Sequence, residues 1–261
     1  MGMKLTKDET IKKINLRKED VKDIWAGFSG NLAGTVSRVA VAIDVSGSMG
    51  DLFRRGVVQE TMERLLPIAL NFDDDGQMDV WTFNSYTKRM PTMTLDNIYG
   101  YIEENKISAG GGTSYDVVIN DIVKFYTEEN PAAMPDYVVF ITDGETFDED
   151  KAEKAIINAS NYPIFWQFVG IGNESFNFLQ KLDAMQGRYV DNAGFIRIQN
   201  LEATKDDELY KGLLAEYPTW LKDEKVKKLI EDGAEVKVST TNTTSTTVEE
   251  KKPRKKLFGI F

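Results

Sequence analysis

Residues 38–49 read RVAVAIDVSGSM, and this stretch decides the fold of the chain. Its first part, Val39 to Ile43, is an unbroken run of small and β-branched residues, which is typical of a strand buried on both faces of a parallel sheet. Asp44, Ser46 and Ser48 follow on the turn that leaves this strand. Ligands of open α/β sheets bind at the carboxyl ends of the strands, so this turn is the first candidate site.

Oxygen side chains of this kind favour a hard divalent cation. Mg²⁺ prefers oxygen ligands in an octahedron and keeps several of its waters, so hydroxyls and a few carboxylates suffice. Gly47 permits the sharp turn that aims both serine hydroxyls at one point. The alternative is an ordinary capped loop, because Asp, Ser and Gly are common loop residues. The Asp-x-Ser-x-Ser pattern alone leaves both interpretations open.

Two distant segments extend the pattern. Residues 110–114 read GGGTS, a glycine loop that presents the Thr113 hydroxyl before an amphipathic segment. Residues 137–144 read YVVFITDG, a second apolar strand that ends in Asp143 and a glycine. In this order and spacing, the three segments resemble the metal-ion-dependent adhesion site of the von Willebrand factor A (vWA) family.

This resemblance implies a metal site made of five residues: Asp44, Ser46, Ser48, Thr113 and Asp143. It implies that the three hydroxyls approach the metal and that the two aspartates act directly or through water. One position would stay open for an acidic group of a partner protein. Mg²⁺ is the expected ion, although oxygen ligands also accept Mn²⁺ and Ca²⁺.

Composition restricts the remaining possibilities. The chain has 261 residues, enough for one large or two small domains with a sizeable core. Its formal net charge of −10 argues against nucleic acid as the main partner. It contains no cysteine, which excludes disulfides and thiolate metal sites and fits a reducing cytosol. It also contains no histidine, so any chemistry must use carboxylates, hydroxyls, lysines or the metal.

Neither a signal peptide nor a membrane span is expected. Residues 1–20 lack an apolar core of signal-peptide length. The sequence also has no apolar run of about 18 residues, the length of a transmembrane helix. These features predict a cytoplasmic protein.

Apolar strands alternate with amphipathic segments along the chain. This order predicts a Rossmann-like, doubly wound α/β fold, with a mostly parallel sheet, helices on both faces and the metal loops at the carboxyl edge. Beyond the two strands quoted above, strands are expected at 78–83, 86–90, 163–171 and 189–191. Helices are expected at 51–72, 96–104, 113–129, 148–159 and 176–185, with further helical candidates at 206–214 and 219–230 split by Pro218.

The chain divides into four parts by composition. Residues 1–36 form an N-terminal extension, either packed on the main domain or a mobile arm, with a short helix expected from about residue 16. Residues 37–200 form the vWA domain, and residues 201–232 form a helical extension packed on it. Residues 233–261 form a flexible Ser/Thr linker and a basic, apolar tail.

The C-terminal half indicates a branch of the family. The segments FWQFVGIG, LQKLD, YVDNAGF and DDELYKGLLAEYPTWL resemble TerF-like proteins of bacterial tellurite and stress resistance, which are related to copines. The resemblance covers roughly residues 36–230. It implies a non-enzymatic, metal-dependent protein-interaction module in a stress-resistance, tellurite-resistance or phage-related assembly. No β-sandwich domain with acidic calcium loops is recognisable upstream, so the role of longer Ter proteins need not transfer.

Two alternative functions stay open. A Mg²⁺-dependent phosphatase or phosphotransferase fits the fold, but its usual second aspartate is replaced by Ser46, and the glycine loop lacks the P-loop lysine. A copine-like membrane adaptor is the other alternative. Residues 251–261 read KKPRKKLFGIF, in which five basic residues precede an apolar end. This tail suits either docking in a partner's groove or weak contact with an anionic membrane.

Overall fold

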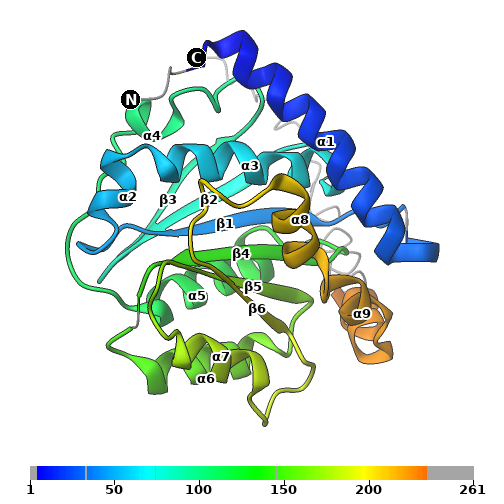
Figure 1. The fold of residues 1–261 in the computed structure, drawn as a ribbon. Coiled ribbons are helices and arrows are strands. Elements are labelled where there is room, and N and C mark those ends of the chain that lie inside the picture. The colour runs from blue at the N-terminus through cyan, green and yellow to red at the C-terminus, as the bar shows by residue number, and fades with distance from the viewer. Residues whose placement is uncertain (1–4, 33, 74, 145, 234–261) are drawn as a thin grey trace, which may run out of the picture.

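The computed structural model describes residues 5–32, 34–73, 75–144 and 146–233. The described residues contain one six-stranded sheet in the order β3-β2-β1-β4-β5-β6 (Figure 1). The strands are β1 (Arg38–Asp44), β2 (Met78–Phe83), β3 (Thr87–Met93), β4 (Asp136–Thr142), β5 (Ile164–Ile171) and β6 (Ala193–Ile198). All neighbouring strands are parallel except the edge pair β2 and β3. The linker and tail were predicted at residues 233–261; residue 233 ends the last described helix, and residues 234–261 lie outside the described residues.

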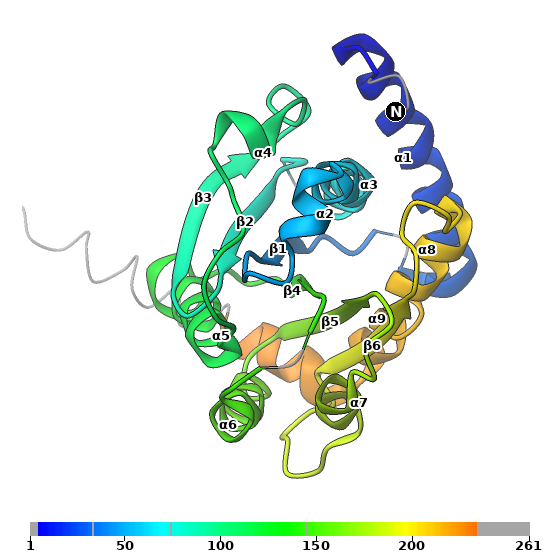
Figure 2. The same cartoon turned by 60° about the vertical axis from the view of Figure 1, so that its left-hand side comes forward.

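Helices cover both faces of the sheet, as Figures 1 and 2 show from two directions. One layer holds α1 (Lys7–Ser29), α3 (Val57–Phe72), α8 (Asp206–Leu214) and α9 (Tyr217–Lys222). The opposite layer holds α5 (Tyr115–Lys124), α6 (Glu149–Ala159) and α7 (Asn177–Ala184). Shorter pieces are α2 (Gly50–Arg54), α4 (Tyr101–Glu104), the 3-10 turn Gly30–Leu32, the π turn Phe125–Glu129 and a last helix over 224–233. The doubly wound α/β fold is therefore confirmed.

The central strand β1 shows why the sequence adopts this architecture. Val39, Val41 and Ile43 point into the core under α3, whereas Ala40 and Ala42 point into the core over α5. Every residue of β1 after Arg38 is buried. A strand covered on both faces has no polar side, which explains the continuous apolar run.

The N-terminal segment forms a long helix that is packed on the rest of the molecule. α1 has 23 residues and starts at a capping box in which Thr6 and Glu9 bond to each other's backbone. Its buried face includes Trp25, whose ring centroid lies 4.6 Å from that of Phe72 and 6.0 Å from that of Tyr217. The prediction of a short helix from about residue 16 is therefore wrong in both start and length, because α1 spans Lys7–Ser29.

No helix of the described residues is both long and apolar enough to cross a bilayer.

Several predicted boundaries are wrong for local physical reasons. The last strand lies at Ala193–Ile198 instead of 189–191, because β6 pairs with β5 from Ala193 onward. The helix expected over 51–72 is divided at Gly56, whose φ of +77° interrupts the helical path. Pro218 lies inside the first turn of α9 instead of between two helices. Proline is tolerated there because the first turn leaves its N–H groups without helical partners. The helix expected over 96–104 is limited to α4.

Candidate metal site

The predicted site residues lie at one edge of the sheet. Asp44 is the last residue of β1, and Asp143 directly follows Thr142, the last residue of the neighbouring strand β4. Thr113 lies in the loop before α5. Parallel strands end at the same edge, so residues far apart in the sequence come together here.

Hydroxyls connect the two strand ends. The Ser46 and Ser48 Oγ atoms are 3.1 Å apart, and the Ser48 hydroxyl donates to Asp143 Oδ1 at 2.7 Å. Ser46 is buried, whereas Ser48 is exposed. The chain of oxygens therefore runs from the interior of the sheet edge toward solvent.

Asp44 lies fully buried beneath this chain of hydroxyls. Its Oδ1 accepts the Ser46 backbone N–H at 2.7 Å, and its Oδ2 accepts the Thr142 hydroxyl at 2.7 Å. Burial raises the pKa of Asp44 to about 6 despite these hydrogen bonds, and the nearby charge of Asp143 adds to the rise. Burial likewise raises the pKa of Asp143, with a further contribution from Glu174. A cation at this edge would offset both carboxylate charges.

Backbone hydrogen bonds join the glycine loop, residues 110–114, to the turn of residues 44–48, which we call the serine turn. The Gly47 N–H donates to Gly111 O at 3.0 Å, and the Gly110 N–H donates to Val45 O at 2.7 Å. The Asn84 side chain also donates to Gly110 O at 2.8 Å. Thr113 is buried in this loop, and among the described contacts no hydrogen bond joins its hydroxyl to the other four site residues. The structure thus links Asp44, Ser46, Ser48 and Asp143 by hydrogen bonds and places Thr113 on the adjoining loop.

Sequence reasoning missed the residues that support this edge. The Tyr115 hydroxyl donates to Gly144 O at 2.6 Å and lies 3.2 Å from the Thr142 hydroxyl. Asp148 accepts the backbone N–H of Tyr115 at 3.1 Å and that of Asp116 at 3.0 Å, so it caps α5 as well as preceding α6. The Thr146 hydroxyl donates to Thr113 O at 3.2 Å. Only Thr142 carried a sequence signal, as the threonine of the Thr-Asp-Gly turn.

A comparison with known families shows to which family this chain belongs. The family model for the vWA domain found at the C terminus of TerF matches residues 36–230. The chain belongs to the TerF-like vWA family. The predicted resemblance is therefore confirmed, and vWA domains as a class are metal-dependent protein-interaction modules.

Two relatives illustrate the range of the family. This TerF-like vWA protein is 38% identical over 225 residues to the uncharacterized protein YcbR of Bacillus subtilis (strain 168), covering 84% of this chain and 90% of YcbR. It is 28% identical over 183 residues to Copine-C of Dictyostelium discoideum, covering 59% of this chain and 34% of Copine-C. The TerF-like vWA protein thus spans about a third of that copine.

Solved structures support the fold. The SpRpn10 VWA domain superposes with a TM-score of 0.52 at 14% identity, covering 67% of this chain and 94% of that domain. Proximal thread matrix protein 1 from the mussel byssus gives a TM-score of 0.52 at 16% identity, covering 77% of this chain and 47% of that protein. At such low identity, these likenesses show the shared vWA fold alone.

Proposed function

We propose that this TerF-like vWA protein is a non-enzymatic interaction module that binds a carboxylate of a partner protein through a divalent metal. The metal would be held by Asp44, Ser46, Ser48, Thr113 and Asp143. The observation that carries the proposal is the hydrogen-bonded chain from Ser46 through Ser48 to Asp143 above a buried aspartate.

The donor set fits Mg²⁺ by its chemistry. All five side chains offer oxygen, which Mg²⁺ prefers, and Mn²⁺ or Ca²⁺ would also accept them. The described residues contain no group of three or more acidic side chains placed to hold a metal. A metal at this edge would therefore rest on two carboxylates and on hydroxyls, and an acidic partner group would fill the coordination position left open.

Exposed aromatic rings beside the site loops support a protein partner. Phe147 is 88% exposed, and its N–H donates to Thr113 O at 3.2 Å. Tyr86 is 80% exposed, and its N–H donates to Asn84 Oδ1 at 2.9 Å. Large exposed aromatic side chains are frequent anchors of protein interfaces. Because both backbones are bonded to the site loops, the two rings would meet whatever binds at the metal edge.

The family assignment supports the wider setting of this proposal. We propose a cytoplasmic role in tellurite or stress resistance, or in a phage-related assembly, as the TerF-like match suggests. The basic, apolar tail, residues 251–261, is proposed as a second contact on its sequence alone.

A metal titration by calorimetry tests the site. We expect wild type to bind Mg²⁺ or Mn²⁺ saturably and Ser48→Ala to lose this binding, because the variant lacks the hydroxyl shared by Ser46 and Asp143. Ser85→Ala, at an exposed serine of the same edge, is the matched control and should bind as wild type does. Equal binding in all three proteins would contradict the site.

An activity assay tests the non-enzymatic assignment. We expect no Mg²⁺-dependent hydrolysis of phosphate esters. Turnover that is present in wild type and lost in Asp44→Ala would instead establish the phosphatase alternative.

A further inference from the structure

A cavity of about 300 Å³ opens beside the proposed metal edge. It lies between the turn joining β2 to β3 and the connection from α4 to α5, which pass each other in Figures 1 and 2. Val45, which separates Asp44 from Ser46, lines the cavity, and so do Asn84 and Tyr86. The cavity is thus continuous with the edge that carries the serine turn.

The lining of this cavity is basic and amphipathic. Lys88 and Lys106 are exposed at its rim, and neither forms an ion pair with a described residue. None of the described residues that line it is acidic, although the chain carries a net charge of −10. Met90 and Ile107 add apolar surface. The cavity therefore complements a ligand with an apolar stem and a negative end.

A buried hydroxyl in the wall has no partner among the described residues. Thr87 Oγ1 is shielded from solvent and has no hydrogen bond within the described part of the chain. Buried hydroxyls are normally hydrogen-bonded, because an unpaired one costs free energy. A bound acceptor could reach this hydroxyl only after the Thr87 side chain rotates toward the cavity, so the hydroxyl is not counted among the contacts of a ligand.

The backbone conformation of Lys106 is a second, independent indication that the cavity is a binding site. Lys106 follows the end of α4 with a φ of +53°, in the left-handed region. Glycine is the usual residue at such a helix end, because a side chain makes this conformation less favourable. A lysine in this position adopts a less favourable backbone conformation and places its ammonium group at the cavity rim. Residues with strained backbones of this kind cluster at functional sites.

We propose that this cavity, the Lys88–Lys106 pocket, binds a glutamate side chain of the partner segment that meets the metal edge. The methylene groups of the glutamate would lie against Met90 and Ile107, as amphipathic side chains do on apolar surface. Its carboxylate would accept hydrogen bonds from the two exposed ammonium groups, those of Lys88 and Lys106. The identity of the partner segment rests on the proposed function, whereas the pocket chemistry rests on its own residues.

The test is an NMR titration of ¹⁵N-labelled full-length protein with a capped pentapeptide of alternating glycine and glutamate. We expect saturable shifts of the Lys88, Lys106 and Ile107 amide signals, and no shifts with the matching glutamine peptide. Lys88→Gln and Lys106→Gly should each weaken binding roughly two- to fivefold, as expected for an exposed ion pair. Lys154→Gln, which removes an exposed charge on α6, is the matched control and should not weaken it.

Thermal unfolding separates binding from folding in this test. Lys106→Gly should unfold at the same temperature as wild type or higher, because glycine relieves the left-handed backbone. Reduced peptide binding in a variant that is at least as stable supports the pocket directly.

Magnesium separates the pocket from the proposed metal site. If both are correct, Mg²⁺ should strengthen peptide binding in wild type but not in Ser48→Ala, which keeps the pocket shifts. Pocket shifts without any effect of Mg²⁺ would support the pocket and contradict the metal site. Absent shifts, unaltered binding in both lysine variants, or shifts with inorganic phosphate but not with the glutamate peptide would overturn the pocket proposal.

Discussion

At the scale of single residues, Asp44 shows how the fold creates a site. A carboxylate at a position with no exposed surface is costly unless it is hydrogen-bonded or paired. Here the Ser46 N–H and the Thr142 hydroxyl each satisfy one carboxylate oxygen. Thr142 is 98 residues away in the sequence, so this support exists only because β1 and β4 are neighbours.

Thr142→Val tests that support. The change removes the hydroxyl donated to Asp44 and should lower the free energy of unfolding by about 1–3 kcal/mol, the cost of leaving a buried acceptor unpaired. It should also weaken metal binding about 10–100-fold, as the loss of outer-shell contacts does at metal sites. Urea unfolding and metal calorimetry measure the two effects.

The control is Thr61→Val, which removes an equally buried hydroxyl bonded to Val57 O inside α3. This variant should alter stability without altering metal affinity. Unchanged metal affinity in both variants would mean that Thr142 does not support the site.

At the scale of elements, the glycine loop depends on one backbone conformation. Gly111 has a φ of +87°, and a Cβ there would lie 3.2 Å from Asn84 Nδ2. Its carbonyl also accepts the Gly47 N–H, which couples this loop to the serine turn. Gly110 differs, since its backbone is outside the left-handed region and a Cβ would meet no atom within 4 Å.

The pair of variants Gly111→Ala and Gly110→Ala tests this dependence. Gly111→Ala should cost about 1–2 kcal/mol of unfolding free energy, because an L residue is strained at positive φ. It should also weaken metal binding, because the loop would move away from the serine turn. Gly110→Ala should alter stability by less than about 1 kcal/mol. Equal behaviour of the two variants in denaturant unfolding would refute the role of Gly111.

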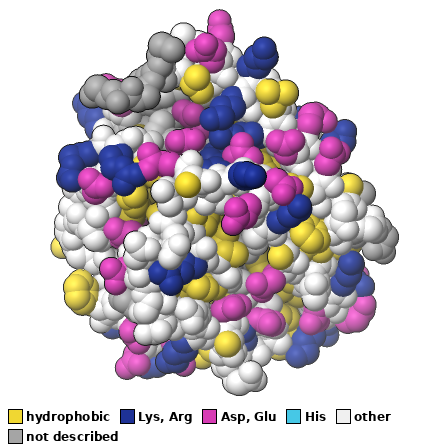
Figure 3. Space-filling model, in the orientation of Figure 1, with side chains coloured by type: hydrophobic (Ala, Val, Ile, Leu, Met, Phe, Trp, Pro, Cys, Tyr) yellow, Lys and Arg dark blue, Asp and Glu magenta, His cyan; other side chains and the backbone are white. Residues whose placement is uncertain are grey.

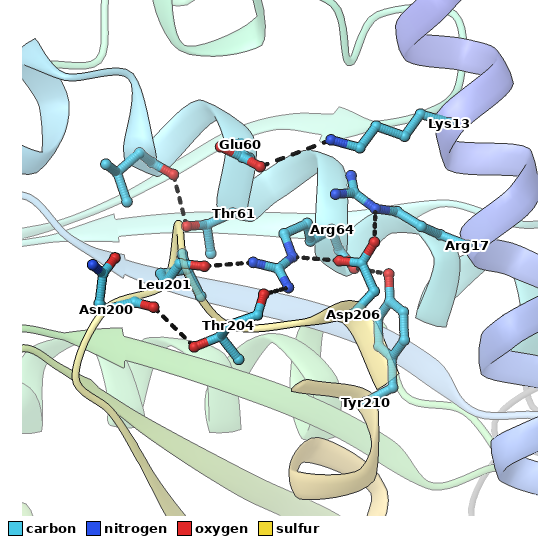
Figure 4. A network of polar contacts seen from close by, with 11 residues as sticks. Lys13, Arg17, Glu60, Thr61, Arg64, Asn200, Leu201, Thr204, Asp206 and Tyr210 are labelled. Carbon is cyan, nitrogen blue, oxygen red and sulfur yellow. Dashed lines mark hydrogen bonds and ion pairs between the residues drawn. The ribbon is translucent and has the colours of Figure 1, made fainter. Parts of the chain in front are cut away.

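At the scale of the whole molecule, a polar network joins three distant parts of the chain (Figure 4). Arg17 Nε of α1 donates to Asp206 Oδ2 at 2.8 Å, and Arg64 Nε of α3 lies 2.7 Å from Asp206 Oδ1 as an ion pair. Arg64 also donates to Leu201 O at 2.7 Å and to Thr204 O at 2.6 Å. Both guanidinium groups are buried. Other charges are mixed over this face, where acidic and basic side chains alternate (Figure 3).

Asp206→Asn should therefore destabilise the whole fold. It leaves two buried guanidinium groups without their carboxylate, which should cost about 3 kcal/mol of unfolding free energy at neutral pH. Asp207→Asn is the matched control, because Asp207 pairs with Lys211 in solvent and should contribute less than about 1 kcal/mol. Similar losses in the two variants, measured by urea unfolding, would contradict the role of the network.

The ion pairs of Asp206 also predict that the free energy of unfolding depends on pH. Burial alone would raise the pKa of Asp206, but the hydrogen bond from Arg17 and the charges of Arg17 and Arg64 hold that pKa below its ordinary value. The unfolded chain therefore binds this proton more readily than the folded protein does. The stabilisation from Asp206 is present above about pH 4 and is lost as pH falls through the folded pKa. The stability difference between wild type and Asp206→Asn should shrink as pH is lowered below about 4.

Local patterns in the sequence predicted the fold class, and the resemblance to the vWA family supplied the five candidate site residues. The apolar run from Val39 to Ile43 predicts a doubly buried strand because its residues must face two helical layers. The order of strand, polar turn and helix predicts that the polar turns meet at one edge. The fold is confirmed, while metal binding by the five residues stays a prediction.

Only the tertiary structure decided the features that depend on distant partners. The length of α1 depends on contacts such as that of Trp25 with Phe72 and Tyr217, and β6 begins where β5 offers it a partner. The support of Asp44 by Thr142 and the pocket at Lys88 and Lys106 likewise join separate segments. The physical reason is that hydrogen bonds and side-chain packing act over a few ångströms in space, whatever the separation along the chain.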